Sequence, residues 1–453
     1  MNTVPTANFE GRSELAATIR LAIPVVFVQL GFMLMGVVDT LMVGRLSAQA
    51  LAAVAIGNLY FFNVTIFGTG TLMALDPIIA QAIGAGDDET VATSVQRGLV
   101  LSVGLSVLTA LLLAPAGSVL RGLHQPAEII PATADYVRIS IVGVAPYFAF
   151  VVLRQSLQAM HRVAPIVVTV VVANCVNAFF NWVFVYGHLG STSLGVAGSA
   201  IATSIGRWVM FLLLLMIAWR DIRPHVLPVR EGITVWPALR RMLAIGVPIG
   251  AQQALEAGAF GAIGLLMGLI STTAVAAHQI AITLAAFTFM VPLGVGSAAA
   301  VRVGHAIGAG DIVRARAAIR AAYASGVGFM ALTAFAFLGA PVLLARAFTN
   351  DGAVIDVAAA LIPIAGFFQV FDGGQAVGAG VLRGAGDTTA PLVVMLTGYW
   401  LLGVPISAYL GFRTSLGASG LWWGFVISLA AVAVFLNVRI RRVFAERIER
   451  VGV

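Results

Sequence analysis

The sequence predicts an all-α integral membrane protein with twelve transmembrane helices, in two six-helix lobes related by a parallel pseudo-twofold repeat. Three observations lead to this prediction: the composition, the number of long apolar runs, and motifs shared by the two halves. Of the 453 residues, 60% are apolar and 10% are charged, and the mean hydropathy is +0.99. Because a soluble domain carries about 25% charged residues, this composition excludes an ordinary soluble protein and a disordered chain.

Twelve apolar runs, each closed by glycine, proline or charge, approach or exceed the roughly 20 residues that a spanning helix needs. No cleavage site follows the charged stretch that ends at Arg20, so we expect the first run to remain in the protein as a helix. The runs lie at residues 15–44, 50–80, 94–116, 131–158, 163–187, 195–219, 238–268, 275–301, 316–343, 354–380, 389–411 and 415–440.

The distribution of charge predicts the orientation. All 26 basic residues are arginine; with the N-terminus inside, 20 of them lie on the cytoplasmic side, five lie outside, and Arg207 lies in mid-span. The positive-inside rule therefore predicts a multi-pass protein of the plasma (inner) membrane with both termini in the cytoplasm. We expect no nucleic-acid partner, because the net charge of +7 arises mostly from arginines that the topology places on the cytoplasmic side of the membrane. The single cysteine, Cys175, excludes a disulfide framework and a CxxC metal site.

An internal repeat relates the two halves of the chain. A shift of 224 residues places Pro24 on Pro248, and a shift of 222 places the triplet at 193–195 on that at 415–417. Each half has an even number of spans, so both copies face the same way. We predict an N-lobe at 1–219 with helices 1–6, a cytoplasmic linker at 220–241, and a C-lobe at 242–453 with helices 7–12 and a basic C-terminal tail. Two such halves are typical of carriers.

The tetrapeptide Gly-Ala-Gly-Asp occurs three times, at residues 84–87, 308–311 and 384–387. We interpret each copy as a glycine that ends one helix and an aspartate that caps the next. None continues into the GK[ST] of a nucleotide-binding loop, and the partner motif of an intramembrane aspartyl protease is absent. We therefore expect no enzyme activity and no cofactor, and an ion gradient as the source of energy.

Apart from Asp135 and Asp356, which lie within a few residues of the outer ends of their spans, four acidic residues fall inside predicted spans: Asp39, Asp76, Glu256 and Asp372. A carboxyl group at the centre of a bilayer costs about 2.5 to 3.5 kcal/mol on translocon scales, so it needs a partner or a role. Arg207 is the only mid-span base, and it can neutralise at most one of them by pairing with Asp39 or Asp76. At least two acids remain, which favours proton or cation handling over a purely structural role.

The depth of each acid in its span separates the four. Asp39 lies five residues before Gly44, and Asn177 and Asn181 lie at similar depth in the fifth span. These amides share one helix face, and they serve either as interhelical contacts or as partners of Asp39. Glu256 and Asp372 lie nearer mid-membrane in the second half, and the repeat does not duplicate them. Asp76 is close enough to a helix end to be solvated, and Pro24 is either a static kink or a hinge.

Three segments resemble the MATE (multidrug and toxic compound extrusion) family: Met35–Gly44, Asn177–Gly187 and Leu382–Thr388. The likeness covers both halves, and the presence of both Glu256 and Asp372 resembles the NorM-like branch. The resemblance implies a V-shaped pair of lobes that exports organic cations and drugs in exchange for sodium or protons. It also implies an ion-coupling site at Asp39, Asn177 and Asn181 in the N-lobe and another at Glu256 and Asp372 in the C-lobe.

One position departs from the family pattern. Sodium-coupled NorM-like members tend to carry tyrosine one turn before the span 10 acid, where this chain has Phe368. The loss of an oxygen ligand weakens sodium binding, so we expect protons as the coupling ion, with sodium at Asp39 or at Glu256 and Asp372 as the alternative. Side chains that could line a drug site by apolar and cation–π contact are Gln279, Phe287, Phe289 and Phe368.

The expected partners are cationic or amphiphilic drugs and membrane lipids, and the protein is expected to be a monomer. A lipid-linked oligosaccharide flippase of the same superfamily is the alternative function. It would be expected to line its cavity with several arginines, and only Arg207 lies in mid-span. A membrane scaffold without transport activity would leave the buried acids unexplained.

Overall fold

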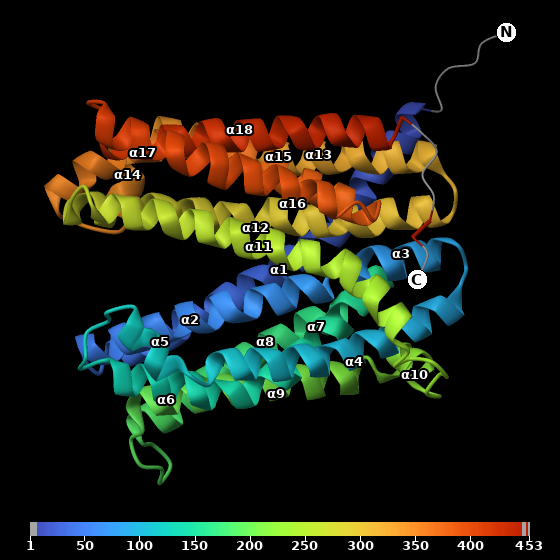
Figure 1. Cartoon of the computed structure of the whole chain (residues 1–453), viewed down its shortest axis with the longest axis horizontal. Coiled ribbons are helices and arrows are strands. Elements are labelled where there is room, and N and C mark those ends of the chain that lie inside the picture. Colours follow the sequence, from blue (N-terminus) through green and yellow to red (C-terminus); the bar gives the residue numbers. More distant parts are fainter. Residues whose placement is uncertain (1–6, 446–449, 452–453) are drawn as a thin grey trace. The chain divides into compact units, whose positions relative to one another are not determined.

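The computed structural model describes residues 7–445 and 450–451, with side chains from residue 14 onward, and these residues form helices and turns without any strand. The ends of the chain, including residues 446–449 and 452–453 of the predicted basic tail, lie outside the described residues. The helices (Figure 1) are α1 (Ala7–Gly44), α2 (Ala48–Leu72), α3 (Leu75–Gly84), α4 (Asp88–Leu113), α5 (Ala116–Gly122), α6 (Ile130–Ser140), η1 (Ile141–Gly143), α7 (Val144–Ala159), α8 (Ala164–Tyr186), α9 (Gly195–Ile217), α10 (Trp219–Val226), α11 (Trp236–Gly268), α12 (Thr272–Gly308), α13 (Ile312–Gly339), α14 (Pro341–Arg346), α15 (Gly352–Gly384), α16 (Thr389–Met395), η2 (Leu396–Gly403), α17 (Val404–Arg413) and α18 (Ala418–Val443).

Eleven helical segments of the described chain are long and apolar enough to cross a membrane, from Glu14–Gly44 to Ala418–Val443. The remaining predicted span, at 238–268, coincides with α11, a helix of 33 residues. This helix is less apolar because it carries Gln252, Gln253 and Glu256 on its central turns. The prediction of a helical membrane protein is confirmed, and the structure contains a helix for each of the twelve predicted spans.

Two of the three Gly-Ala-Gly-Asp turns end and begin helices as the sequence predicts. At the third, Thr388 precedes α16 without a side-chain capping bond of its own, and Asp387 accepts from Arg439 Nε at 2.7 Å. Gly86 and Gly310 have φ values of 70° and 71°, a left-handed conformation that glycine adopts without strain. Asp87 and Asp311 then accept hydrogen bonds from the backbone N–H groups of Thr90 and Arg314 at 3.0 and 2.9 Å. These side chains satisfy N–H groups that the first helical turn leaves without a partner.

Three predicted spans are interrupted rather than continuous. A turn separates α2 from α3 at Met73 and Ala74, a 3₁₀ segment (η1) joins α6 to α7, and a π-helical segment (η2) joins α16 to α17. Such interruptions change which side chains face inward, and in membrane proteins they occur where neighbouring protein satisfies the backbone. Two of them, η1 and η2, lie beside buried polar residues described below.

The described residues form two compact units. The N-unit comprises Phe27–Ile79 and Asp87–Gly250, and the C-unit comprises the described parts of Met1–Val26, Ala80–Gly86 and Ala251–Gly452. The boundaries therefore differ from the predicted lobes, because α1 and α11 each contribute to both units. In α1 and α11 the boundary falls two residues after a proline, Pro24 and Pro248; the end of α3 and the turn after it, Ala80–Gly86, also belong to the C-unit. The two copies of the repeat therefore share this feature: α1 and α11 pass from one unit to the other at equivalent positions.

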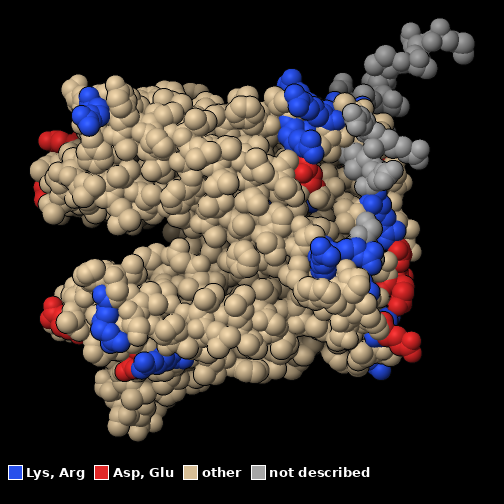
Figure 2. Space-filling model, viewed as in Figure 1, with Lys and Arg blue, Asp and Glu red and all other residues tan. Residues whose placement is uncertain are grey.

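Charged side chains gather at the ends of the helices, and the length between the ends is almost entirely uncharged on the face that Figure 2 shows. Within the C-unit, α12 and α15 make extensive contact through small residues. A Cβ atom on Gly296 would approach the carbonyl oxygen of Ala376 to 2.7 Å, so only glycine allows this backbone approach. This close packing places the middle of α15, including Asp372, inside the unit.

Candidate functional site

The N-unit buries one carboxyl group among polar side chains of three helices. Asp39 of α1 is 2% exposed. Its Oδ1 atom accepts hydrogen bonds from Asn177 Nδ2 at 3.1 Å and from Asn181 Nδ2 at 2.7 Å, both on α8. Its Oδ2 atom accepts from Thr203 Oγ1 of α9 at 2.8 Å. Three donors on one carboxyl group complement a negative charge that the apolar surroundings would otherwise oppose.

Local helix geometry explains why α8 supplies two of these donors. Asn177 and Asn181 are four residues apart and therefore lie one above the other on one helix face. Asn181 Nδ2 also donates to the carbonyl oxygen of Asn177 at 3.0 Å, which holds its amide in place. Asn174, one turn earlier, instead donates to the carbonyl oxygens of Gly31 and Val170 at 3.1 and 2.8 Å. The structure thus brings Asp39 together with the two predicted amides and uses the third to join α8 to α1.

Sequence reasoning missed Thr203. Its helix carries a series of small and hydroxyl residues between Ser199 and Ser204, and this series was the available signal. A hydroxyl group in a membrane helix most often donates to the carbonyl four residues earlier, which makes Thr203 look ordinary. Only the position of α9 beside α1 and α8 shows that it donates to Asp39.

Arg207 lies one helical turn after Thr203 on α9 and is 8% exposed. Its guanidinium carbon is 3.8 Å from the ring centroid of Phe61 and 5.9 Å from that of Tyr147. A Cβ atom on Gly143 would lie 2.8 Å from Arg207 Cδ, so the glycine at the end of η1 leaves room for this side chain. A face-on aromatic ring is a favourable surrounding for a partly desolvated cation.

The arginine forms an ion pair with neither acid that the sequence suggested. Its one hydrogen bond among the described residues runs from Nη1 to the carbonyl oxygen of Ser140 at 3.4 Å. Arg207 and Asp39 are nevertheless close enough to interact electrostatically. Asp76 is fully buried at the start of α3 rather than solvated, and its Oδ1 accepts from Gln155 Nε2 at 2.9 Å. The structure therefore excludes the possibility, left open by the sequence, that Asp76 is solvated at the interface.

The C-unit holds its two acids with fewer donors. Glu256 of α11 is half-buried, and its Oε1 accepts from Gln375 Nε2 at 3.3 Å. Asp372, one turn before Gln375 on α15, is 3% exposed, and its Oδ1 atom has no hydrogen-bond partner among the described residues. The two carboxyl groups are close enough to interact with each other electrostatically. Two carboxylates cannot both stay ionised at short range without a compensating proton or cation.

Two further buried oxygen atoms belong to this part of the C-unit. Gln375 Oε1 and Tyr399 Oη have no hydrogen-bond partner among the described residues. Tyr399 lies in η2, one turn after Met395, whose sulfur lies 3.8 Å from Gln375 Nε2. Buried polar atoms are nearly always paired in native proteins, so unpaired ones indicate a ligand, a proton or water. Sequence reasoning missed Gln375 and Tyr399; a glutamine three residues after the span 10 acid was the signal.

The predicted substrate-lining residues differ in exposure. Phe368 is 1% exposed, and its ring centroid lies 5.5 Å from that of Trp422 and 5.7 Å from that of Phe425. Phe287 is 59% exposed, Phe289 is half-buried, and Gln279 is exposed, with Nε2 3.4 Å from Thr283 Oγ1. Phe368 therefore belongs to a packed aromatic cluster one turn from Asp372, whereas the other three lie on the accessible surface of α12.

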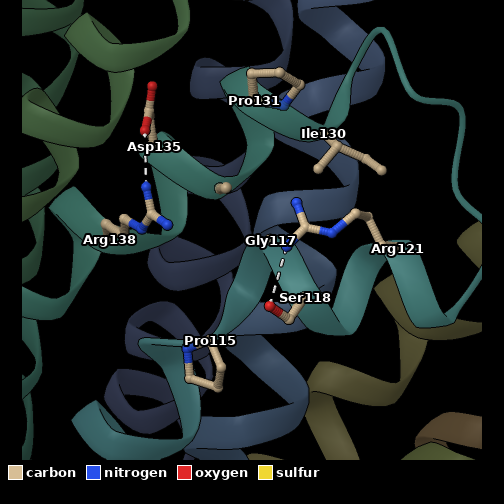
Figure 3. Close-up of a pocket in the computed structure, with 9 residues that line it drawn as sticks. Pro115, Gly117, Ser118, Arg121, Ile130, Pro131, Asp135 and Arg138 are labelled. Atoms are coloured by element: carbon tan, nitrogen blue, oxygen red, sulfur yellow. Dashed lines mark hydrogen bonds and ion pairs between the residues drawn. The ribbon is translucent and has the colours of Figure 1, made fainter.

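A small pocket elsewhere in the N-unit is open at the surface. It has a volume of about 260 Å³ and lies between α5 and α6 (Figure 3). Its charged side chains are already paired: Arg138 Nη1 lies 3.5 Å from Asp135 Oδ1, and Arg121 Nη2 donates to Ser118 Oγ at 3.1 Å. It contains none of the buried intramembrane acids, so it is separate from the candidate ion sites.

The helices and buried acids define a polytopic membrane protein with a carboxyl site in each of its two units. Comparison with known proteins is consistent with this class. The MatE family model matches residues 24–183 and 248–409. The chain is 37% identical to the probable multidrug resistance protein NorM of Mesorhizobium japonicum over 438 residues, which cover 94% of each protein. It is 35% identical to the multidrug resistance protein MdtK of Edwardsiella ictaluri, with 95% of each covered.

The chain belongs to the MATE family, in its NorM-like branch. Solved structures agree on the fold. The eukaryotic MATE transporter AtDTX14 superposes with a TM-score of 0.88 at 22% identity, covering 98% of this chain and all of that one. The Vibrio cholerae MATE transporter VcmN in the bent form gives 0.86 at 19% identity, covering 96% and 98%. At the level of the family the protein is therefore a multi-pass membrane transporter rather than an enzyme.

Proposed function

We propose that the protein is a secondary antiporter of the inner membrane, with both termini in the cytoplasm, that exports organic cations and drugs in exchange for protons or sodium. The observation that carries this proposal is Asp39, a carboxyl group buried in a spanning helix with three side-chain donors. A group held in this way binds a proton or a cation reversibly, because its ionised form is stabilised but not neutralised. The names of the relatives, which are multidrug resistance proteins, support drugs as the exported class.

In the N-unit the proposed event is the neutralisation of Asp39. A proton on Oδ2 turns that atom into a donor, so the Thr203 hydroxyl must rotate to accept. A sodium ion would instead need oxygen ligands, and rotation of the Asn177 and Asn181 amides by about 180° presents them. The oxygen atoms of both amides are buried without a hydrogen-bond partner among the described residues, so the rotations would break only the bonds at the nitrogen atoms, including that from Asn181 Nδ2 to the Asn177 carbonyl oxygen.

Arg207 is the proposed reason that neutralising Asp39 releases a cationic drug. With Asp39 ionised, the two charges balance and the site tolerates a nearby cation. With Asp39 neutralised, the fixed charge of Arg207 remains and repels a cation through a medium of low dielectric constant. Ion entry and drug exit are then linked by charge alone, whichever ion carries the charge.

In the C-unit the proposed event is the binding of a cation or proton between Glu256 and Asp372. We favour protons as the coupling ion, because Phe368 lies where a tyrosine would supply an oxygen and is packed among aromatic rings. Pro24, near which α1 leaves one unit for the other, is the proposed hinge. Gln279, Phe287 and Phe289 offer the proposed drug-contacting surface, and the protein is proposed to act as a monomer without a cofactor.

The test is efflux of a fluorescent organic cation from proteoliposomes under a proton gradient or a sodium gradient imposed separately. We expect the proton gradient alone to drive efflux. Efflux driven only by sodium would reverse the preference for protons, and no efflux under either gradient would contradict the antiporter. The alternative function, a flippase, is supported only by the buried cation of Arg207. Assaying the same proteoliposomes with a labelled lipid-linked oligosaccharide tests it.

A further inference from the structure

A groove lies between the first turns of α13 and the last turns of α18, inside the C-unit and at its predicted cytoplasmic end. Its volume is about 560 Å³. Among the described residues the lining combines three arginines with apolar side chains and contains no acidic residue: Val313, Arg316, Ile319, Arg320, Ile440, Arg441, Phe444 and Ala445.

One of the three arginines joins the two helices that form the groove, and the other two are available to a ligand. Arg316 donates from Nε at 3.1 Å and from Nη2 at 2.6 Å to the carbonyl oxygen of Phe444, which ties α13 to the end of α18. Arg320 and Arg441 are exposed, and neither donates to any described residue. Ten guanidinium N–H donors on the two side chains therefore remain available to an anion.

The floor and walls of the groove are apolar. Ile440 and Phe444 are buried beneath it, whereas Val313 on its wall is 63% exposed. Both helices continue from this point into segments long and apolar enough to span the membrane. A ligand that fits these surroundings carries a negative group at one end and hydrocarbon at the other.

The repeat shows that the corresponding place in the N-unit is filled by protein. Gln96 on α4 is the equivalent of Arg320 at the shift of 224 residues. It is buried, and its Nε2 atom lies 3.2 Å from each of the carbonyl oxygens of His225 and Val226 and 2.9 Å from that of Pro228. Its Oε1 accepts from the backbone N–H of Arg230 at 2.8 Å. A neutral amide thus binds the polypeptide linker in one unit, where the other unit has an arginine.

We propose that this groove binds an anionic phospholipid of the cytoplasmic leaflet, with its phosphate between Arg320 and Arg441 and the hydrocarbon next to it against Ile319 and Ile440. The charge of the rim matches a phosphate diester, and guanidinium groups bind phosphate through paired N–H donors. Basic pockets between spanning helices on the cytoplasmic side are suited to anionic headgroups. This inference does not depend on the transported substrate or on the coupling ion.

The test titrates the purified full-length protein in micelles with phosphatidylglycerol or phosphatidylcholine and counts bound lipid by native mass spectrometry. We expect one phosphatidylglycerol to bind more tightly than any phosphatidylcholine. Arg320→Gln, which introduces the residue found at the equivalent position of the N-unit, should weaken that binding about fivefold, and adding Arg441→Gln should bring the loss to about 25-fold. Arg346→Gln with Arg413→Gln removes the same charge at the predicted outer end of the C-unit and should leave binding unchanged.

Four outcomes would overturn the proposal. Equal binding of the two lipids would remove the need for a charged headgroup. An equal loss in the outer pair of variants would make the effect one of net charge. Displacement of the lipid by inorganic phosphate at a similar concentration would identify a free-anion site. Unchanged phosphatidylglycerol binding after Arg320→Gln with Arg441→Gln would place the bound lipid elsewhere on the protein.

Discussion

The carboxyl sites of the two units differ in how much of the negative charge the protein itself stabilises. Asp39 in the N-unit accepts three side-chain hydrogen bonds and has the cation of Arg207 nearby. In the C-unit, Glu256 accepts one amide hydrogen bond, and Asp372 Oδ1 has no partner among the described residues. One site is therefore organised around a single ionised acid, whereas the other brings two acids together with little to stabilise both as anions.

Under the proposed function, this difference predicts that the two sites hold the coupling ion with different strength. Neutralising Asp39 would cost hydrogen bonds that the anion had made, so we expect that site to release its ion readily. A proton or cation between Glu256 and Asp372 would relieve repulsion, so we expect that pair to retain its ion more strongly. We therefore expect the two sites to respond differently to substitution, with the largest effect at Asp39 and the smallest at Phe368.

Asp39→Asn should abolish gradient-driven efflux of a fluorescent cation, whereas Asp372→Asn should reduce it by only about tenfold. The reason is that Asp39 has no second carboxyl group to take its place, while Glu256 remains beside position 372. Initial efflux rates from proteoliposomes, normalised to inserted protein, measure both. Asp135→Asn, an exposed acid of the N-unit that pairs with Arg138, is the matched control and should keep the wild-type rate. A larger loss for Asp372→Asn than for Asp39→Asn would contradict the comparison.

Arg207→Gln should reduce the dependence of drug binding on Asp39. In the wild-type background, Asp39→Asn should weaken binding of a cationic dye at least about tenfold; after Arg207→Gln the same substitution should cost about twofold. Fluorescence titration of the four proteins gives this double-mutant cycle. Arg207→Lys keeps the charge but loses the flat stacking on Phe61, so it should restore the wild-type difference. If Lys and Gln behave alike, Arg207 acts through packing and not through charge.

Phe368→Tyr should add a modest sodium response to the C-unit. Position 368 lies one turn before Asp372 on the same face of α15, so a tyrosine oxygen there extends the set of oxygen ligands. Burying the hydroxyl without a partner should lower the free energy of unfolding by about 1–3 kcal/mol. Sodium, but not potassium, should recover part of that loss. Thermal unfolding in each salt measures it, with Phe425→Tyr as the control in the same aromatic cluster. An equal response to both salts would exclude the added ligand.

The sequence anticipated most of the helical architecture. Each predicted span matches helical structure to within eight residues at either end, because hydrocarbon admits few backbone conformations besides a helix. The capping roles of Asp87 and Asp311 were also predicted correctly, since they depend only on neighbouring backbone. Depth counted from Gly44 and Gly187 brought Asp39 level with Asn177 and Asn181, and the structure joins them by hydrogen bonds.

Contacts between distant segments were harder to foresee. Thr203, Gln375 and Tyr399 looked like ordinary residues of membrane helices, because their roles depend on which helix lies opposite. The sequence left open whether Asp76 is solvated, whereas in the structure it is buried and accepts a hydrogen bond from Gln155 of α7. Arg207 had two candidate partners in the sequence, and the structure instead places its guanidinium over Phe61, in space left by Gly143.

From the residues alone it follows that this chain crosses a membrane many times, that its halves repeat, and that a few acids lie where hydrocarbon disfavours them. Those properties follow from the free energy of transferring each side chain, which depends on residue type and on spacing along one helix. Only the tertiary structure decided which donors reach Asp39, which oxygens remain unpaired near Asp372, and where α1 and α11 pass from one unit to the other. Each of these depends on the rotation and approach of whole helices, which packing among many side chains fixes jointly.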